Sequence, residues 1–206
     1  MRVALVSGGK DSLYAMLLAW PVEVALVLSY EFPRPSPHLL NLGKTVETLL
    51  LTGVPVTVVK LSRGREKEGT VRALRVLGAT EVVAGDVYIE EHLKYTESIA
   101  AEVGASLVEP LWGEDPEELL YREVEAGIET LVVGCLASLS PWLGRVLNVS
   151  TVQDFAGFCR RAGVDPLGER GEYHTLVLSS PLHSSKLTYR SLGVEVYGDY
   201  LVLRLV

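Results

Sequence analysis

The sequence is short of cysteine, and the two cysteines that it has are far apart. Cys135 and Cys159 are separated by 24 positions in a chain of 206 residues and form no CxxC pair. This spacing argues against a disulfide framework and against a zinc site, and it is typical of proteins from a reducing compartment. We therefore expect a cytoplasmic protein in which both thiols are buried.

Positive charge and long apolar runs are also scarce. Lys and Arg number 19 against 26 Asp and Glu, which gives a net charge of −7. Charge-driven binding of nucleic acid needs a basic face, so we expect no nucleic-acid partner. The most apolar stretch, residues 14–30, is interrupted by Pro21 and Glu23. A membrane-spanning helix needs about 20 mostly apolar residues, so we expect no membrane segment, and residues 3–6 are too short for a signal peptide.

The first half of the chain alternates apolar runs with helix-like segments. The predicted strands are residues 2–7, 22–30, 54–61, 81–87 and 105–108, and the predicted helices are residues 11–19, 39–52, 66–77 and 90–103. The strands lack polar alternation, which indicates burial on both faces, as in a parallel sheet covered by helices. The sequence therefore predicts an α/β, Rossmann-like domain.

The character of the sequence changes near residue 112. Asp115 can cap a helix that begins at Pro116, and Gly163 can end a helix over residues 151–161. Residues 130–136 predict a buried strand, and residues 194–206 an antiparallel pair. We predict two domains, residues 1–112 and a smaller α+β domain for substrate binding at residues 113–206.

Three prolines follow the second predicted strand. Pro33, Pro35 and Pro37 predict a stiff loop over residues 31–38. In open α/β folds this edge of the sheet is where ligands bind. A plain connection between strand and helix is the alternative.

The strongest chemical signal is the glycine loop, residues 7–12, with the sequence Ser7-Gly8-Gly9-Lys10-Asp11-Ser12. It follows the first predicted strand and opens the first helix. Two glycines allow a tight turn whose N–H groups face one spot before the helix N-terminus, and such a spot binds anions. The two serines add hydroxyl donors and the lysine a positive charge. The spacing fits neither a Walker A loop nor G-x-G-x-x-G.

Asp11 is the unexpected member of this loop. A carboxylate beside a polyphosphate is repulsive unless a cation lies between them, so Asp11 predicts magnesium. Simple capping of the helix is the alternative.

The glycine loop resembles the PP-loop of the ATP pyrophosphatases, within the adenine nucleotide alpha-hydrolase (HUP) group. The resemblance implies that ATP is split to AMP and pyrophosphate, with the β,γ-phosphates held by the loop. It also implies that adenine lies at the ends of the second and fourth strands, here at Ser29 and Gly85. An ordinary glycine at a strand end is the alternative for Gly85.

A second polar motif lies far down the chain, at residues 168–175. Its sequence is Gly-Glu-Arg-Gly-Glu-Tyr-His-Thr, and a buried strand follows at once. A glycine-flanked turn that leads into such a strand presents its side chains at a sheet edge. Its two carboxylates and its histidine suit acid–base work, magnesium binding or the binding of an ammonium group. A solvated turn with internally paired charges is the alternative.

This motif resembles the GExGE[FY]xT signature of the diphthine–ammonia ligase family. Residues 110–112 (PLW) and 142–145 (WLGR) match two further elements of that family, in the same order. The resemblance implies that a substrate carboxylate attacks the α-phosphorus of ATP and that ammonia converts the acyl-adenylate to an amide. The protein substrate implied is translation elongation factor 2 carrying diphthine, and the product is diphthamide.

The resemblance also implies roles for single residues. Glu169, Glu172 and Tyr173 suit the quaternary ammonium of diphthine. His174 is implied to orient ammonia, and Arg145 to steady the charge on the α-phosphate. A structural histidine and a surface ion pair are the respective alternatives.

Two segments depart from the family pattern, residues 36–41 and 85–93, and the second is more similar to a sister branch of PP-loop proteins. Two other functions therefore stay open: ATP pyrophosphatase chemistry on a different acceptor, and a sensor that binds adenine nucleotides without turnover. The sequence leaves self-association into a homo-oligomer open as well.

Overall fold

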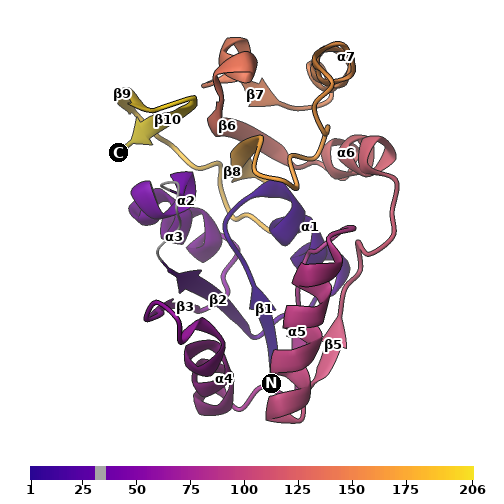
Figure 1. The fold of residues 1–206 in the computed structure, drawn as a ribbon, viewed down its shortest axis with the longest axis vertical. Helices are drawn as coiled ribbons and strands as arrows, with labels where there is room; N and C mark the ends of the chain where they lie inside the picture. Colours follow the sequence, from indigo (N-terminus) through magenta and orange to yellow (C-terminus); the bar gives the residue numbers. More distant parts are fainter. Residues whose placement is uncertain (31–35) are drawn as a thin grey trace.

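The computed structural model describes residues 1–30 and 36–206, and it places two sheets toward opposite ends of the long axis of the molecule (Figure 1). Pro33 and Pro35, in the predicted stiff loop, lie outside the described residues. The first sheet is built from the N-terminal half of the chain and the second from the C-terminal half.

In the described residues the first sheet has five strands in the order β3-β2-β1-β4-β5, and all its neighbours are parallel. The strands are β1 (Arg2–Leu5), β2 (Val24–Ser29), β3 (Val56–Lys60), β4 (Glu81–Val83) and β5 (Ser106–Val108). The order reverses direction at β1, where β4 lies on the side opposite β2. In a doubly wound sheet such a switch point opens a crevice at the carboxyl ends of the strands, where ligands bind.

Helices cover both faces of this sheet. They are α1 (Lys10–Leu18), α3 (Leu42–Leu50), α4 (Glu66–Leu77) and α5 (Glu90–Val103), whereas α2 (Pro37–Leu40) packs on strands of the second sheet. Val3, Leu26 and Val82 pack with Leu74 and Ile99 on one face of the sheet. Ala4, Ala25 and Val83 belong to a separate cluster on the other face. The predicted α/β class with a doubly covered parallel sheet is confirmed.

The helix predicted over residues 39–52 is divided at Asn41. The Asn41 side chain donates a hydrogen bond to the Leu203 carbonyl at 2.9 Å and accepts one from the Leu205 N–H at 2.9 Å. Both partners belong to the last strand of the chain, so a long-range contact interrupts a segment that is locally suited to one helix. The strand predicted over residues 81–87 ends at Val83.

The second sheet is antiparallel and centred on β6, which pairs with β7, β8 and β10, while β9 pairs with β10. The strands are β6 (Glu129–Leu136), β7 (Val146–Leu147), β8 (Tyr173–Ser179), β9 (Ser191–Tyr197) and β10 (Tyr200–Leu205). The helices beside them are α6 (Pro116–Glu125), the 3-10 helix η1 (Ala137–Trp142) and α7 (Val152–Ala162).

The helix boundaries predicted in this half follow from capping chemistry. The Asp115 carboxylate accepts hydrogen bonds from the N–H groups of Glu117 and Glu118, both at 3.0 Å, and so caps α6. Gly163 ends α7 with a φ of 64°, a left-handed conformation that glycine adopts without strain. Both predicted boundaries are confirmed.

Strand β8 connects the second sheet to the glycine loop. The Val177 N–H donates to the Gly8 carbonyl at 2.9 Å, and the Lys10 N–H donates to Thr175 Oγ1 at 3.1 Å. The Thr48 hydroxyl of α3 donates to the Val177 carbonyl at 2.5 Å. One strand of the C-terminal half therefore holds the loop of the N-terminal half in place.

The two halves also share an apolar core. Leu13 and Met16 of α1 belong to the same buried cluster as Leu119 of α6 and Phe155 of α7. Because the two halves pack on one core, the domain boundary near residue 112 stays a prediction. Among residues 1–30 and 36–206, none of the helices has both the length and the apolarity that crossing a bilayer requires.

A glycine in β6 lets α2 approach the second sheet. A Cβ at Gly134 would lie 2.2 Å from Pro37 Cγ and 3.1 Å from the Tyr200 hydroxyl oxygen. We expect Gly134→Ala to lower the free energy of unfolding by about 1–3 kcal/mol, the usual cost of overpacking. Urea denaturation measures this value.

Gly43→Ala is the matched control, because a Cβ at Gly43 in α3 meets nothing within 4 Å. We expect it to raise stability by about 0.5–1 kcal/mol through helix propensity. Equal stability of the two variants would contradict the close approach of α2 to β6.

Candidate functional site

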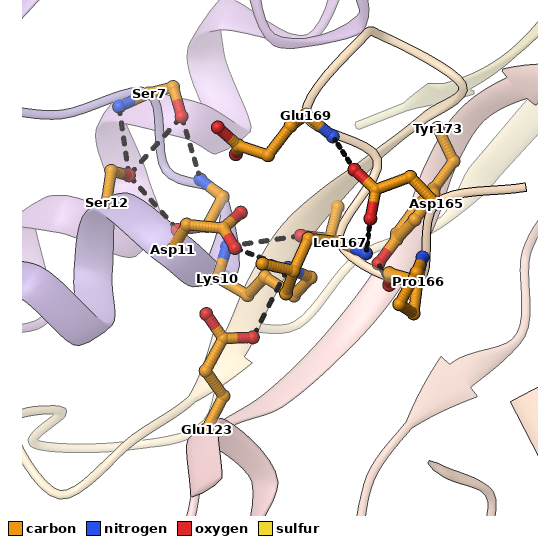
Figure 2. Close-up of polar contacts among 12 residues, drawn as sticks. Ser7, Lys10, Asp11, Ser12, Glu123, Asp165, Pro166, Leu167, Glu169 and Tyr173 are labelled. Carbon is orange, nitrogen blue, oxygen red and sulfur yellow. Dashed lines mark hydrogen bonds and ion pairs between the residues drawn. The ribbon is translucent and has the colours of Figure 1, made fainter. Parts of the chain in front are cut away.

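The glycine loop has the closed geometry expected of an anion site. Gly8 has a φ of +81°, which allows the tight turn between β1 and α1. The Ser7 N–H donates to the Ser12 hydroxyl at 3.2 Å, and the Gly9 N–H donates to the Ser7 hydroxyl at 3.3 Å (Figure 2). The two serines therefore hold the loop shape at the start of α1, where the helix dipole favours a negative ligand.

Lys10 differs from the expectation of a free positive charge. Its ammonium lies 2.5 Å from Asp11 Oδ1 and 3.3 Å from Glu123 Oε2 of α6, and its side chain is 2% exposed (Figure 2). Burial lowers the Lys10 pKa, but the Asp11 and Glu123 carboxyls outweigh it and raise that pKa well above its usual value. Lys10 is thus a buried cation shared by two carboxyl groups.

Glu123 is a member of the site that the sequence analysis missed. Its side chain is fully buried beside Lys10. Burial raises its pKa well above the ordinary value, the nearby Asp11 adds to the effect, and Lys10 opposes it. A signal was available, because Glu123 shares the buried stripe of α6 with Leu119, Leu120 and Val124.

The segment before β8 is folded around another unpredicted residue, Asp165. Its carboxylate accepts hydrogen bonds from the Tyr88 hydroxyl at 2.6 Å and from the N–H groups of Leu167 and Glu169, both at 3.0 Å. The Tyr173 hydroxyl donates to the Pro166 carbonyl at 2.6 Å. These bonds fix the turn so that Glu169 points toward the glycine loop (Figure 2). An aspartate before Pro-x-Gly is a turn signal that could have identified Asp165.

A cavity of about 1070 Å³ lies between the glycine loop and this turn. Its lining brings together most of the predicted site residues, from both halves of the chain: Ser7, Gly9, Lys10, Asp11, Ser12, Gly85, Glu169, Tyr173 and His174. The two motifs, more than 150 residues apart in the sequence, therefore form one site.

Other predicted site residues lie outside the cavity lining. Glu172 accepts a hydrogen bond from the Arg170 N–H at 3.0 Å within the turn. Arg145 is exposed and stacks on the Trp142 ring at 4.4 Å, and that ring packs on Phe155 in the core. Ser29 does not line the cavity, although its neighbours Leu28 and Tyr30 do.

One side of the cavity is acidic. Asp11, Asp86 and Glu169 line it, and burial, with Asp11 adding to the effect, raises the Glu169 pKa to about 7. Behind Asp86, burial raises the Glu109 pKa to about 8. This wall suits a cation or a proton acceptor that works near neutral pH.

Gly85 lines the same cavity and also allows close packing. A Cβ there would lie 3.0 Å from the Asp11 carbonyl oxygen and 3.2 Å from Ala15 Cβ. The absence of a side chain therefore lets the end of β4 meet the first turn of α1. This contact accounts for the glycine whether or not adenine also lies against it.

The described residues contain no group of three or more His, Cys, Asp or Glu side chains that could hold a metal ion on their own. Asp11 faces the cavity as a single carboxylate beside the glycine loop. Magnesium commonly uses only one or two protein carboxylates together with substrate phosphates and water. Asp11 fits that donor set.

The parallel sheet with a switch point at β1, and the glycine loop that leads into α1, define a Rossmann-like α/β fold. Within this class the comparisons identify the family. Residues 1–107 match the model described as Diphthamide synthase N-terminal domain, and residues 115–200 match Diphthamide synthase C-terminal domain. The chain belongs to the diphthamide synthase family.

Individual relatives are distant but align over most of their length. The chain is 26% identical to a diphthine--ammonia ligase of Rattus norvegicus, over 91% of this chain and 82% of that protein. It is 24% identical to a diphthine--ammonia ligase of Homo sapiens, over 96% and 86%. A solved structure titled as a predicted subunit of tRNA methyltransferase from Methanocaldococcus jannaschii matches at 15% identity and a TM-score of 0.44, covering 88% of this chain and 97% of that one.

The buried position of Glu123 gives a pH-dependent prediction for stability. A carboxyl with a raised pKa keeps its proton in the folded state, whereas the unfolded chain releases it above the ordinary value of 4.5. The contribution of this group to stability is therefore lost as pH rises from that value. Glu123→Gln removes the proton requirement and keeps the shape. We expect the free energy of unfolding of Glu123→Gln to increase relative to that of the parent as pH rises from 5 to 8.

Urea denaturation of parent and variant at several pH values measures this difference. Glu125→Gln, on the exposed side of the same helix, is the control and should follow the parent at every pH. A constant difference between parent and Glu123→Gln would show that Glu123 is ionised in the fold.

Proposed function

We propose that the chain is an ATP-dependent amide ligase that converts diphthine on translation elongation factor 2 to diphthamide with ammonia. The observation that carries the proposal is the docking of β8 on the glycine loop through the Val177–Gly8 and Lys10–Thr175 hydrogen bonds. These contacts place the two family motifs on one cavity. The names of the relatives supply the reaction, and the cavity supplies groups that suit each part of it.

The first step concerns the phosphates. The loop residues Ser7, Gly8, Gly9 and Ser12 bind the β,γ-phosphates at the start of α1. The substrate carboxylate attacks the α-phosphorus, an oxygen–phosphorus bond forms, and the bond to the pyrophosphate oxygen breaks. Magnesium, held by Asp11 and the phosphates, would neutralise part of their charge. AMP is left joined to the substrate as an acyl-adenylate.

The second step forms the amide. Ammonia attacks the acyl carbon, the carbon–nitrogen bond forms, the bond to the AMP oxygen breaks, and one proton is released. Glu169 is positioned to help because its carboxyl faces the cavity and its pKa is about 7, so it can accept a proton near neutral pH. His174 lines the same cavity and stays a candidate for orienting ammonia.

The acidic wall also suits the acceptor. Diphthine carries a quaternary ammonium, which cannot donate hydrogen bonds and is recognised by charge and by aromatic faces. Glu169 and Asp86 supply the charge. Glu172 and Arg145 lie outside the cavity lining, so we assign them structural roles, Glu172 in the turn and Arg145 on the Trp142 ring. Tyr173 is buried with its hydroxyl on Pro166, so it acts by holding the turn.

The central experiment incubates the protein with ATP, magnesium and ammonium, with and without diphthine-bearing elongation factor 2. We expect AMP and pyrophosphate only when the factor is present, together with conversion of the diphthine carboxylate to the amide by mass spectrometry. AMP formation that does not depend on the factor would indicate a different acceptor. Tight ATP binding without AMP would favour a nucleotide sensor.

Gly8→Val is the loop variant for this assay. A β-branched residue at a φ of +81° is strained, and a Cβ there would lie 3.2 Å from Thr45 Cγ2. We expect AMP formation to fall at least about a hundredfold, in line with losses on removing transition-state contacts. Gly53→Val, which also has positive φ but lies outside the glycine loop, controls for backbone strain. Equal turnover in both variants would contradict a role for the loop in catalysis.

Glu169 gives a pH dependence for the protein substrate. Its carboxyl ionises near pH 7, so attraction of the quaternary ammonium should strengthen, and KM should fall, as pH rises from 6 to 8. We expect Glu169→Gln to remove this dependence and to raise KM at pH 8 on the order of tenfold, or about 1.4 kcal/mol. Glu91→Gln, exposed and outside the cavity lining, should behave as the parent. If the pH dependence of KM in Glu169→Gln is identical to that of the parent, Glu169 does not bind the substrate.

A further inference from the structure

Helix α2 brings a histidine to the glycine loop. Pro37 packs on the bare backbone of Gly134, and the Thr45 hydroxyl donates to the His38 carbonyl at 3.0 Å. In the register of the second sheet Gly134 lies opposite His174. The packing of Pro37 therefore sets His38 beside His174.

The His38 ring lies directly over the loop. Its Cε1 atom is 3.3 Å from the position that a Cβ on Gly9 would occupy, so the missing side chain of Gly9 leaves room for the ring. The ring meets His174 edge to face, with 5.4 Å between centroids, and both histidines line the cavity. Any anion bound at the loop therefore lies next to His38.

Both imidazoles are neutral at physiological pH. Burial lowers the His38 pKa to about 3, and His174 adds to the effect. Burial lowers the His174 pKa to about 4. The Nδ1 atom of His38 is buried and has no hydrogen-bond partner among residues 1–30 and 36–206. A proton on Nδ1 would lack an acceptor there, which places the proton of the neutral ring on Nε2.

The lysine and arginine side chains on the elements packed against α2, and Lys10 of the loop, are paired with carboxyl groups. The Lys10 ammonium is occupied by Asp11 and Glu123. On α3, Lys44 pairs with Glu47, and on β10, Arg204 pairs with Glu195. The titratable groups on the remaining elements packed against α2 are His174 and Tyr173 of β8, Tyr200 of β10, and Glu129 and Cys135 of β6.

We propose that His38 donates a hydrogen bond from Nε2 to a phosphate oxygen of a polyphosphate held at the glycine loop, with His174 fixing the ring from behind. The contact is made by a neutral imidazole and adds no positive charge. The ligand class is the pyrophosphate group, whether free or as part of ATP. The inference rests on the nucleotide-binding part of the proposed function and not on the acceptor.

The test measures binding of magnesium pyrophosphate and of magnesium ATP to the full chain by calorimetry. His38→Leu removes the donor, and His38→Gln keeps a neutral N–H donor near the position of Nε2. We expect the dissociation constant for both ligands to rise about tenfold or more in His38→Leu, since hydrogen bonds to charged groups are among the stronger ones. His38→Gln should stay within about threefold of the parent. His92→Gln, on the acidic side of the cavity, should match the parent.

A pH series separates a neutral donor from a cation. The ratio of the dissociation constants of His38→Gln and the parent should stay constant from pH 6 to pH 8, because neither side chain titrates there. A ratio that grows as pH falls would overturn the neutral donor. Parent-like pyrophosphate binding in His38→Leu would overturn the contact itself, and an effect on ATP alone would place His38 away from the phosphates.

Folding of each variant is checked by its thermal unfolding midpoint. Should His38→Leu fail to fold, His38→Met fills the same space without a donor and carries the same expectation. If the parent and His38→Leu bind pyrophosphate equally well, the inference about His38 is wrong and the proposed function is unaffected. If binding depends on His38 but no AMP forms with elongation factor 2, the proposed function is wrong and the inference about His38 stands.

Discussion

The site depends on the hydrogen bonds between strand β8 and the glycine loop. A glycine-rich loop before a helix has little structure of its own, because glycine loses the most conformational entropy on folding. The Val177–Gly8 and Lys10–Thr175 bonds remove that freedom and tie the loop to a strand buried in the second sheet. The glycine loop of the N-terminal half is therefore held in place by a strand of the C-terminal half. The same contacts hold the residue 168–175 motif beside the loop.

The charged side chains around the glycine loop and the cavity differ in sign and in burial. Lys10 neutralises Asp11 and also contacts the Glu123 carboxyl of α6, so its ammonium is held in the interior between α1 and α6. Glu169 and Asp86 make one cavity wall acidic, and His38 and His174 make another neutral. An anion and a cation can therefore occupy different sides of the same cavity without a strongly basic surface, which agrees with a net charge of −7.

Much of the fold was predictable because local rules agreed with each other. Helices over residues 66–77 and 90–103 have the predicted limits, and the Asp115 cap and the Gly163 end follow from capping chemistry alone. The helix over residues 39–52 was not, because Asn41 bonds to Leu203 and Leu205 more than 160 residues away. At the site the loop and the residue 168–175 motif were recognisable, whereas the Lys10–Glu123 and Tyr88–Asp165 contacts and the place of His38 over the loop join segments that only folding brings together.

The sequence by itself determined the parallel α/β sheet, the glycine loop with its serines, and the family, because these depend on periodicity, glycine placement and short motifs. The tertiary structure decided which of the polar side chains face the cavity. Glu169 and Glu172 are three positions apart in one motif, yet the Asp165 hydrogen bonds turn the first toward the loop, and the second stays bonded to the Arg170 N–H. Side-chain direction in this turn is set by its hydrogen bonds, which include the bond from Tyr88 to Asp165 across 77 positions, and residue type alone does not carry that information.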